Sequence, residues 1–204
     1  MIKANTLSTL YLIIISIALC LPTSVFATEM SVAQKQPTKD DIAYLKQDAP
    51  VFEITIPELR AKFNQQNPLL SLNEYKIITN HDIAIPLVRA ATRITPYLYS
   101  SAILERGSEK IKSLQLTLLH TPDSPELEKI NREITTQYII TLVTQFDSSI
   151  TSEQIQEALN LFAFKNQTSD YISHDVGAIR YIIVHEDDQL TTFAIEPVSY
   201  THLT

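Results

Sequence analysis

Glycine, cysteine and tryptophan are scarce in this chain of 204 residues, and each shortage excludes a class of chemistry. With only Gly107 and Gly177 present, neither a phosphate-binding P-loop nor a dinucleotide fingerprint can be formed. The one cysteine, Cys20, lies in an N-terminal segment that we expect to be removed. A disulfide framework, thiol catalysis and cysteine-based zinc sites are therefore excluded from the mature chain. No tryptophan is available to stack on a sugar ring.

The first 27 residues have the parts of a secretory signal peptide. Lys3 supplies a positive charge, residues 10–21 form an apolar run, and residues 25–27 (VFA) fit a small-x-small cleavage site. We expect cleavage after residue 27 and no stable transmembrane anchor afterwards, because a membrane helix needs about 20 apolar residues. A lipoprotein attached through Cys20 is the alternative, and the bulky Leu19 before it disfavours this reading.

The charge balance limits the partners. The chain carries 16 basic and 23 acidic residues, a net charge of −7. Removal of residues 1–27 takes away one base, Lys3, and no acid, so the net charge becomes −8. Nonspecific binding to nucleic acid or to an anionic lipid surface needs clustered lysine and arginine, so neither is expected as a partner.

Hydrophobic patterning predicts a single α+β domain over residues 50–198, between a flexible polar lead-in at 28–49 and a tail at 199–204. Alternating apolar residues predict strands, and apolar spacings of three or four predict helices. The lead-in has room for one helical turn near residues 42–45. The predicted strands are 52–56, 97–104, 114–118, 178–184 and 191–197, and the predicted helices are 55–65, 85–94, 124–146 and 151–162.

Capping and turn residues support several of these boundaries. The patterns Thr55-x-x-Glu58 and Thr151-x-x-Gln154 are capping boxes, each of which predicts the start of a helix. Residues 105–109 (ERGSE) predict the turn of a β-hairpin, and residues 165–170 predict a loop. The longest helix should bury one continuous apolar stripe, which consists of Leu127, Ile130, Ile134, Tyr138, Leu142 and Phe146.

Taken together, the elements predict an antiparallel sheet made of two β-hairpins and packed against about four helices. Each capping-box helix precedes a hairpin. This order indicates a weak duplication of a helix-hairpin unit, with the long helix between the two copies.

We predict no catalytic, cofactor or metal site from the motifs. Three histidines precede acids, at 81–82, 174–175 and 185–186, but each pair falls in a predicted turn and none has the i, i+4 spacing of a helical metal site. Serine, histidine and aspartate are present, but the G-x-S-x-G elbow of a nucleophilic serine is not.

Two groups of residues remain as candidate contacts with a ligand or partner. The amides of Asn64 and Asn67 lie in the run FNQQNPLLSLNEY (63–75), where they either end the helix and fix the following loop or form a polar site. Arg89 and Arg106 belong to a basic stretch, with Arg93, Lys110 and Lys112, among tyrosines. That stretch either holds an anionic ligand or acidic partner, or is an ordinary solvated surface.

Three segments resemble a known family. They are FNQQNPLLSLNEY (63–75), RAATRITPYLYSSAILERGSEKIKSLQLT (89–117) and GAIRYIIVHEDDQLTTFAIEP (177–197). The chain resembles the YiiQ-like family of secreted enterobacterial proteins, a domain of unknown function, from about residue 52 to residue 197. The resemblance implies an exported periplasmic protein of a Gram-negative bacterium, and it supplies no catalytic residues.

These observations favour a non-enzymatic periplasmic domain that binds a periplasmic protein, a peptide or another component of the bacterial envelope. The alternative is an envelope hydrolase whose site is assembled from distant residues. A cleft with converging histidine, acid and arginine side chains would favour the hydrolase. An exposed apolar patch or an open sheet edge would favour the binding domain.

Overall fold

An antiparallel sheet with α-helices on one face forms the part of the chain that the computed structural model describes. That part comprises residues 43–46, 48–78, 87–163, 171–186 and 189–198, all within one compact unit, Ala33–Thr204. The predictions for the signal peptide (1–27), the loop at 165–170 and the tail (199–204) lie outside the described residues, as does most of the lead-in. In chain order the elements are a short 3-10 helix Ala43–Leu45, β1 Phe52–Thr55, α1 Ile56–Gln66, β2 Lys76–Ile78, β3 Leu87–Arg93, β4 Leu98–Glu105, β5 Lys110–Leu119, α2 Pro125–Phe146, α3 Ser152–Ala163, β6 Tyr171–Val176, β7 Ile179–Glu186 and β8 Leu190–Pro197.

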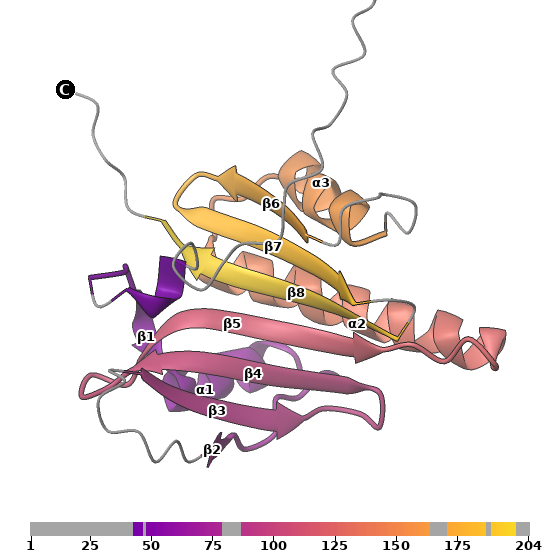
Figure 1. Cartoon of the computed structure of the whole chain (residues 1–204), viewed down its shortest axis with the longest axis horizontal. Coiled ribbons are helices and arrows are strands. Elements are labelled where there is room, and N and C mark those ends of the chain that lie inside the picture. The colour runs from indigo at the N-terminus through magenta and orange to yellow at the C-terminus, as the bar shows by residue number, and fades with distance from the viewer. Residues whose placement is uncertain (1–42, 47, 79–86, 164–170, 187–188, 199–204) are drawn as a thin grey trace, which may run out of the picture. The chain divides into compact units, whose positions relative to one another are not determined.

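Seven of the eight strands follow the order β2-β3-β4-β5-β8-β7-β6, and the eighth, β1, pairs with the first residues of β5. Two meanders, β3-β4-β5 and β6-β7-β8, therefore meet through their last strands, which pair antiparallel in the middle of the sheet. The helices α1 and α2 lie behind the strands in Figure 1, so the view is onto the face of the sheet that they leave uncovered. The helix α1 precedes the first meander and α3 the second. The repeating unit would thus hold three strands rather than a hairpin, and the duplication itself stays a prediction.

Both capping boxes begin helices as predicted. At α1 the Thr55 backbone N–H donates to the Glu58 carboxylate over 2.8 Å. At α3 the Thr151 backbone N–H donates to the Gln154 side-chain oxygen over 2.9 Å, and the Gln154 N–H donates back to Thr151 Oγ1 over 3.3 Å. Each box satisfies two backbone N–H groups that a helix start otherwise leaves free.

The turn between β4 and β5 depends on Gly107. Its φ of +100° lies in the region that side chains disfavour, while a Cβ at this position would meet no atom within 4 Å. Only the backbone conformation therefore requires glycine here. The predicted hairpin of β4 and β5 is confirmed, but four residues, 106–109, connect its strands rather than the predicted five.

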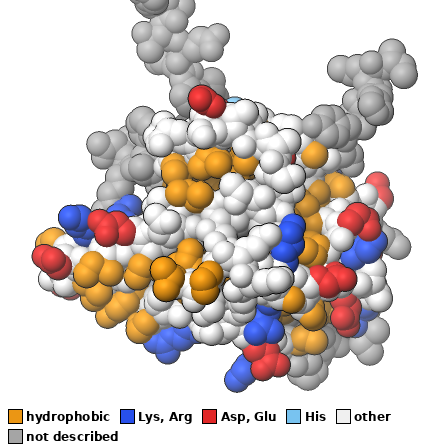
Figure 2. Space-filling view, turned by 180° about the vertical axis from the view of Figure 1, so that it is seen from behind, with side chains coloured by type: hydrophobic (Ala, Val, Ile, Leu, Met, Phe, Trp, Pro, Cys, Tyr) orange, Lys and Arg blue, Asp and Glu red, His pale blue; other side chains and the backbone are white. Residues whose placement is uncertain are grey.

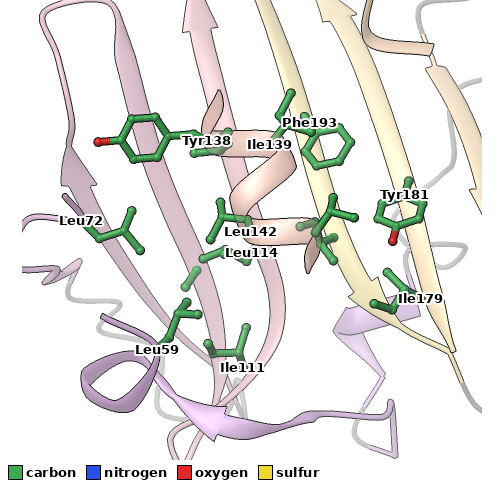
Figure 3. Packing of buried hydrophobic residues seen from close by; sticks show 14 of the residues in the cluster. Leu59, Leu72, Ile111, Leu114, Tyr138, Ile139, Leu142, Ile179, Tyr181 and Phe193 are labelled. Atoms are coloured by element: carbon green, nitrogen blue, oxygen red, sulfur yellow. The ribbon is translucent and has the colours of Figure 1, made fainter. Parts of the chain in front are cut away.

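The core lies between the sheet and the helices. In Figure 3, Ile139 and Leu142 of α2 lie between Leu72 on one side and Tyr181 on the other. Phe63 of α1 stacks on Tyr138 of α2, with ring centroids 5.7 Å apart. Burial of side chains of this size contributes about 1.5–3 kcal/mol each. Among the side chains less than 2% exposed are Leu59, Phe63, Leu72, Leu98, Ile111, Leu114, Leu116, Leu118, Ile139, Tyr181 and Phe193.

The prediction of a helix at residues 85–94 was wrong, because residues 87–93 form strand β3. All seven of its residues pair with β4, and three of them pair with β2 on the other side. Its buried positions include Ala90 and Thr92, which alternate with the exposed Arg89 and Arg93. Strand pairing on both sides outweighs the helix preference of the two alanines. The described residues hold three α-helices rather than four.

The predicted stripe of α2 was correct only in its second half. Tyr138 and Leu142 are buried, but Ile130 is 45% exposed. The first half of α2 buries Asn131 and Thr135 instead. The Thr135 hydroxyl donates to the Asn131 carbonyl over 2.7 Å, which allows this polar side chain to be buried.

Two strands were not predicted. The strand β2 has only three residues, all exposed at one edge of the sheet, and β6 forms the other edge. The six residues of β6 include only two aliphatic residues, Ile172 and Val176, among polar ones. This pattern is too short to predict a strand directly after a predicted loop.

Candidate functional site

The side of the sheet opposite α1 and α2 can be described residue by residue, because cross-strand pairs share a face. We call this surface the helix-free face. On β5 and β8, Leu114 pairs with Ile195, which brings Ser113 beside Glu196 on this face. The pairings give three rows across the sheet: Ile78, Arg89, Ile103, Ser113, Glu196, Arg180 and Asp175; Lys76, Ala91, Ser101, Gln115, Ala194, Ile182 and Ser173; and Arg93, Tyr99, Thr117, Thr192, Val184 and Tyr171.

Short polar side chains occupy the centre of the helix-free face. The hydroxyls of Thr117 and Thr192 are 3.0 Å apart, and the Ser101 hydroxyl donates to the Gln115 side-chain oxygen over 3.2 Å. All four side chains are partly exposed. Each hydroxyl or amide keeps unused donor or acceptor capacity, so the centre of this face can form hydrogen bonds with a ligand.

Cations lie on the β2–β3 side of the helix-free face. Lys76, Arg89 and Arg93 are exposed, and none of them forms an ion pair with another described residue. The Arg93 Nε donates to the Thr95 carbonyl over 3.2 Å, and its guanidinium lies 5.8 Å from the centre of the Tyr99 ring. These contacts fix the direction of Arg93 while leaving its remaining N–H groups available.

A buried carboxyl, Glu196, lies in the middle of the first row. It is 3% exposed, between Ser113 and Arg180. Burial raises the pKa of Glu196 to about 7, and the Ser113 hydroxyl and Arg180 offset this only in part. Arg180 is directed instead to Asp175, which it binds with two N–H groups over 2.7 and 2.9 Å. That pairing lowers the pKa of Asp175.

The described end of the lead-in also contacts the helix-free face. Lys112, which is 1% exposed, donates from Nζ to the carbonyl of Lys46 over 2.9 Å. Tyr44 forms a hydrogen bond with Gln115 and lies near both Glu196 and Arg89. Burial, and to a smaller extent the charge of Glu196, raises the pKa of Tyr44. The residues 43–46 therefore lie over part of the helix-free face, where Tyr44 contacts Gln115 of the middle row.

The two predicted amide contacts take part in the architecture. Asn64 Nδ2 donates to the Leu72 carbonyl over 3.2 Å, and the Leu72 N–H donates to Asn64 Oδ1 over 2.8 Å. Asn67 Nδ2 donates to the Phe63 carbonyl over 2.9 Å at the end of α1. The expectation that these amides satisfy the helix end and the following loop is confirmed. Whether Asn64 or Asn67 also contacts a partner stays a prediction.

The two predicted arginines lie on different parts of the fold from the amides. Arg89 is on the helix-free face, and Arg106 is exposed in the turn between β4 and β5. Arg106 reaches the Leu87 carbonyl at 3.5 Å. Of the four candidates, only Arg89 therefore belongs to the helix-free face, and its role as a ligand contact stays a prediction.

The histidine–acid pairs do not form a metal cluster within the described residues. His174 Nε2 lies 3.3 Å from Glu157 of α3, while its neighbour Asp175 binds Arg180. His185 lies beside Thr191, as described below. The pair at 81–82 lies outside the described residues.

A second polar region, not predicted from the sequence, lies on the helix side, where the β5–α2 connection meets β8. The His120 ring contacts Glu128 Oε1 through Nδ1 and Thr191 Oγ1 through Nε2, each over 2.8 Å. The His185 Nδ1 is also 2.8 Å from Thr191 Oγ1. Arg132 Nε donates to Glu128 Oε1 over 2.6 Å. We call these five residues the His120 network.

The His120 network joins segments far apart in the chain. Glu128 also accepts a hydrogen bond from the Thr121 backbone N–H over 2.8 Å. Burial raises the pKa of Glu128, but the hydrogen bonds from Thr121 and His120 and the charges of Arg132 and His120 outweigh it and lower the pKa to about 2. Thr191 is 2% exposed. A shallow hollow of about 390 Å³ on α2 is lined by Glu128 and Arg132, but not by Thr191 or His120. The Thr191 hydroxyl therefore does not line this hollow.

Exposed hydrophobic side chains are not confined to the helix side, since Ile78 belongs to the helix-free face. Figure 2 shows hydrophobic side chains in separate patches with charged side chains between them. The most exposed large hydrophobic side chains among the described residues are Leu69, Ile77, Ile78 and Ile130. None of the described helices is both long and apolar enough to span a membrane.

These features define a two-layer α+β protein with one sheet face free of described α-helices. Residues 12–203 match the model of a family described as "Protein of unknown function (DUF1454)", so the chain belongs to this family. The chain is 34% identical over 166 residues to the uncharacterized protein YiiQ of Escherichia coli (strain K12), a match that covers 81% of this chain and 82% of that protein. No solved structure matches the chain. The resemblance noted from the three segments is confirmed.

Proposed function

We propose that this protein is exported to the periplasm and acts there as a non-enzymatic binding protein of the bacterial envelope, with the helix-free face as its binding surface. The observation that carries the proposal is the composition of this face. Partly exposed Ser101, Gln115, Thr117 and Thr192 lie at its centre, and cations that form no ion pair with another described residue lie at its border. The signal-peptide pattern of residues 1–27 supports export.

Site-specific photo-crosslinking tests this function. A benzophenone amino acid at Thr117 reports what lies on the helix-free face, and the same group at Gln137, an exposed position of α2, is the matched control. In a Gram-negative host we expect discrete adducts in the periplasmic fraction from position 117 and none of the same size from position 137. The same adducts from both positions, or none from position 117, would reject this face as the binding surface.

A hydrolase is the second candidate, and the His120 network is the observation that favours it. A hydroxyl on His120 Nε2 and a carboxylate on Nδ1 have the connectivity of a hydroxyl–histidine–carboxylate triad. Against it, Thr191 is 2% exposed. Labelling by a fluorophosphonate that is lost in Thr191→Val would favour the hydrolase, and equal labelling of both proteins would reject it.

A further inference from the structure

The ligand class of the helix-free face can be narrowed from its chemistry. Protein–protein interfaces are typically centred on aromatic and other large apolar anchors. Here the middle row carries Ala91, Ser101, Gln115 and Ala194 on inner strands and Ser173 on the edge strand β6, with Ile182 as its one large apolar member. A surface of hydroxyls, an amide and small side chains suits a ligand with many hydroxyl groups of its own.

The charges at the border of this face select the sign of the ligand. Lys76 lies across from Ala91, between Arg89 and Arg93 on the neighbouring strand. The two arginines are four residues apart, about 13 Å along the strand. The carboxylate of Glu105 is on the same face but accepts a hydrogen bond from the Ser108 hydroxyl over 2.5 Å. Arg180 is paired with Asp175. The β2–β3 side therefore presents three cations on a chain of net charge −7.

The available arginine N–H groups match carboxylates in particular. A guanidinium donates two parallel hydrogen bonds to a carboxylate, which is stronger and more directional than contact with a neutral oxygen. Tyr99, whose ring faces Arg93, adds an amphipathic surface beside the hydroxyls of Thr117.

Resting on the proposed binding function, we infer that the helix-free face binds an acidic glycan, a chain of sugar units that carries carboxylates. The hydroxyls of the sugars bond to Ser101, Gln115, Thr117 and Thr192, and the carboxylates bind Arg89, Arg93 and Lys76. An acidic polypeptide would satisfy the cations but not the short polar centre, and a neutral glycan would leave the cations unused.

Binding to defined polymers tests this inference. The purified protein is titrated by calorimetry with polygalacturonate, an acidic glycan, with dextran, a neutral glycan, and with polyglutamate, an acidic polypeptide. We expect binding to polygalacturonate that weakens as salt is added, because the cations are exposed. Dextran and polyglutamate should bind at least about tenfold more weakly.

Matched double variants locate the site. Arg89→Ala with Arg93→Ala should weaken polygalacturonate binding about tenfold or more. Lys62→Ala with Lys129→Ala removes the same charge from exposed helix positions and should leave affinity unchanged. Equal losses in the two variants, tighter binding of polyglutamate, equal binding of dextran, or no binding of polygalacturonate would each overturn the glycan inference. None of these results would change the crosslinks expected from position 117. A wrong ligand class can therefore be distinguished from a wrong assignment of the binding surface.

Discussion

Asn64 on α1 binds both backbone polar groups of Leu72, accepting from its N–H over 2.8 Å and donating to its carbonyl over 3.2 Å. Arg60 donates to the same carbonyl over 3.2 Å. Leu72 is 1% exposed, so its backbone lies where unsatisfied polar groups are costly. The amide therefore anchors the segment after Pro68 to the helix, and it brings the Leu72 side chain into the core.

Replacement of Asn64 by alanine should destabilise the protein by about 1–3 kcal/mol, because the Leu72 N–H loses its acceptor. Gln65→Ala changes a neighbouring exposed amide and should stay within about 0.5 kcal/mol of the wild type. Urea unfolding followed by circular dichroism measures both variants. If Asn64→Ala were as stable as Gln65→Ala, the amide would have no architectural role, and its interpretation as a ligand contact would gain support.

The α1 region was predictable because its signals are local. Thr55 and Glu58 form a capping box, Leu59 and Phe63 share one helix face, and Pro68 follows the helix end. The β3 strand was not predictable in this way, because Leu87 is its one large buried apolar residue and its other buried positions are the small Ala90 and the polar Thr92. Its strand character comes from the two neighbouring strands, which the sequence order alone does not reveal.

The two polar regions show the same limit. Arg89 stood out from the sequence as part of a basic stretch, but the face it occupies depends on the pairing of seven strands. The His120 network brings Thr191 against a histidine 71 positions earlier. Neither residue lies in a recognisable motif, so only the tertiary fold assembles the network. Glu196 lies in the predicted strand 191–197, but nothing in that pattern indicates that its side chain is only 3% exposed.

The hydroxyl of Thr191 should matter more than that of its neighbour Thr192. Thr191→Val removes the group that both His120 and His185 contact, and should cost about 1–3 kcal/mol of unfolding free energy. Thr192→Val makes the same chemical change on the opposite face, where the side chain is partly exposed, and should cost about 0.5 kcal/mol or less. Urea unfolding at neutral pH compares them. Equal losses would show that the His120 network does not stabilise the fold.

Glu128 should make the protein sensitive to acid. Its pKa is about 2 in the folded protein, below the ordinary value of 4.5, so its ionised form stabilises the folded state above pH 4.5. This contribution is lost as the pH falls from 4.5 towards 2. Glu128→Gln should therefore be less stable than the wild type at pH 7 and approach it near pH 3, as measured by urea unfolding. Glu133→Gln, an exposed change on the same helix, is the control. A stability difference that did not shrink on acidification would exclude ionisation of Glu128 as its source.

Glu196 should have the opposite dependence on pH. Burial raises its pKa to about 7, above the ordinary 4.5, so the folded protein holds this proton more tightly than the unfolded chain. Its contribution is fully present below pH 4.5 and is lost as the pH rises through 7, since the folded state must then ionise a buried carboxyl. Glu196→Gln should therefore exceed the wild type in stability by on the order of 2 kcal/mol at pH 8 and match it near pH 4. Glu105→Gln, on a less buried carboxyl of the same face, should show no such gain at pH 8. If Glu196→Gln were no more stable than the wild type at pH 8, ionisation of the Glu196 carboxyl would not destabilise the fold. The charge of Arg180 would then have to offset the burial of the carboxylate.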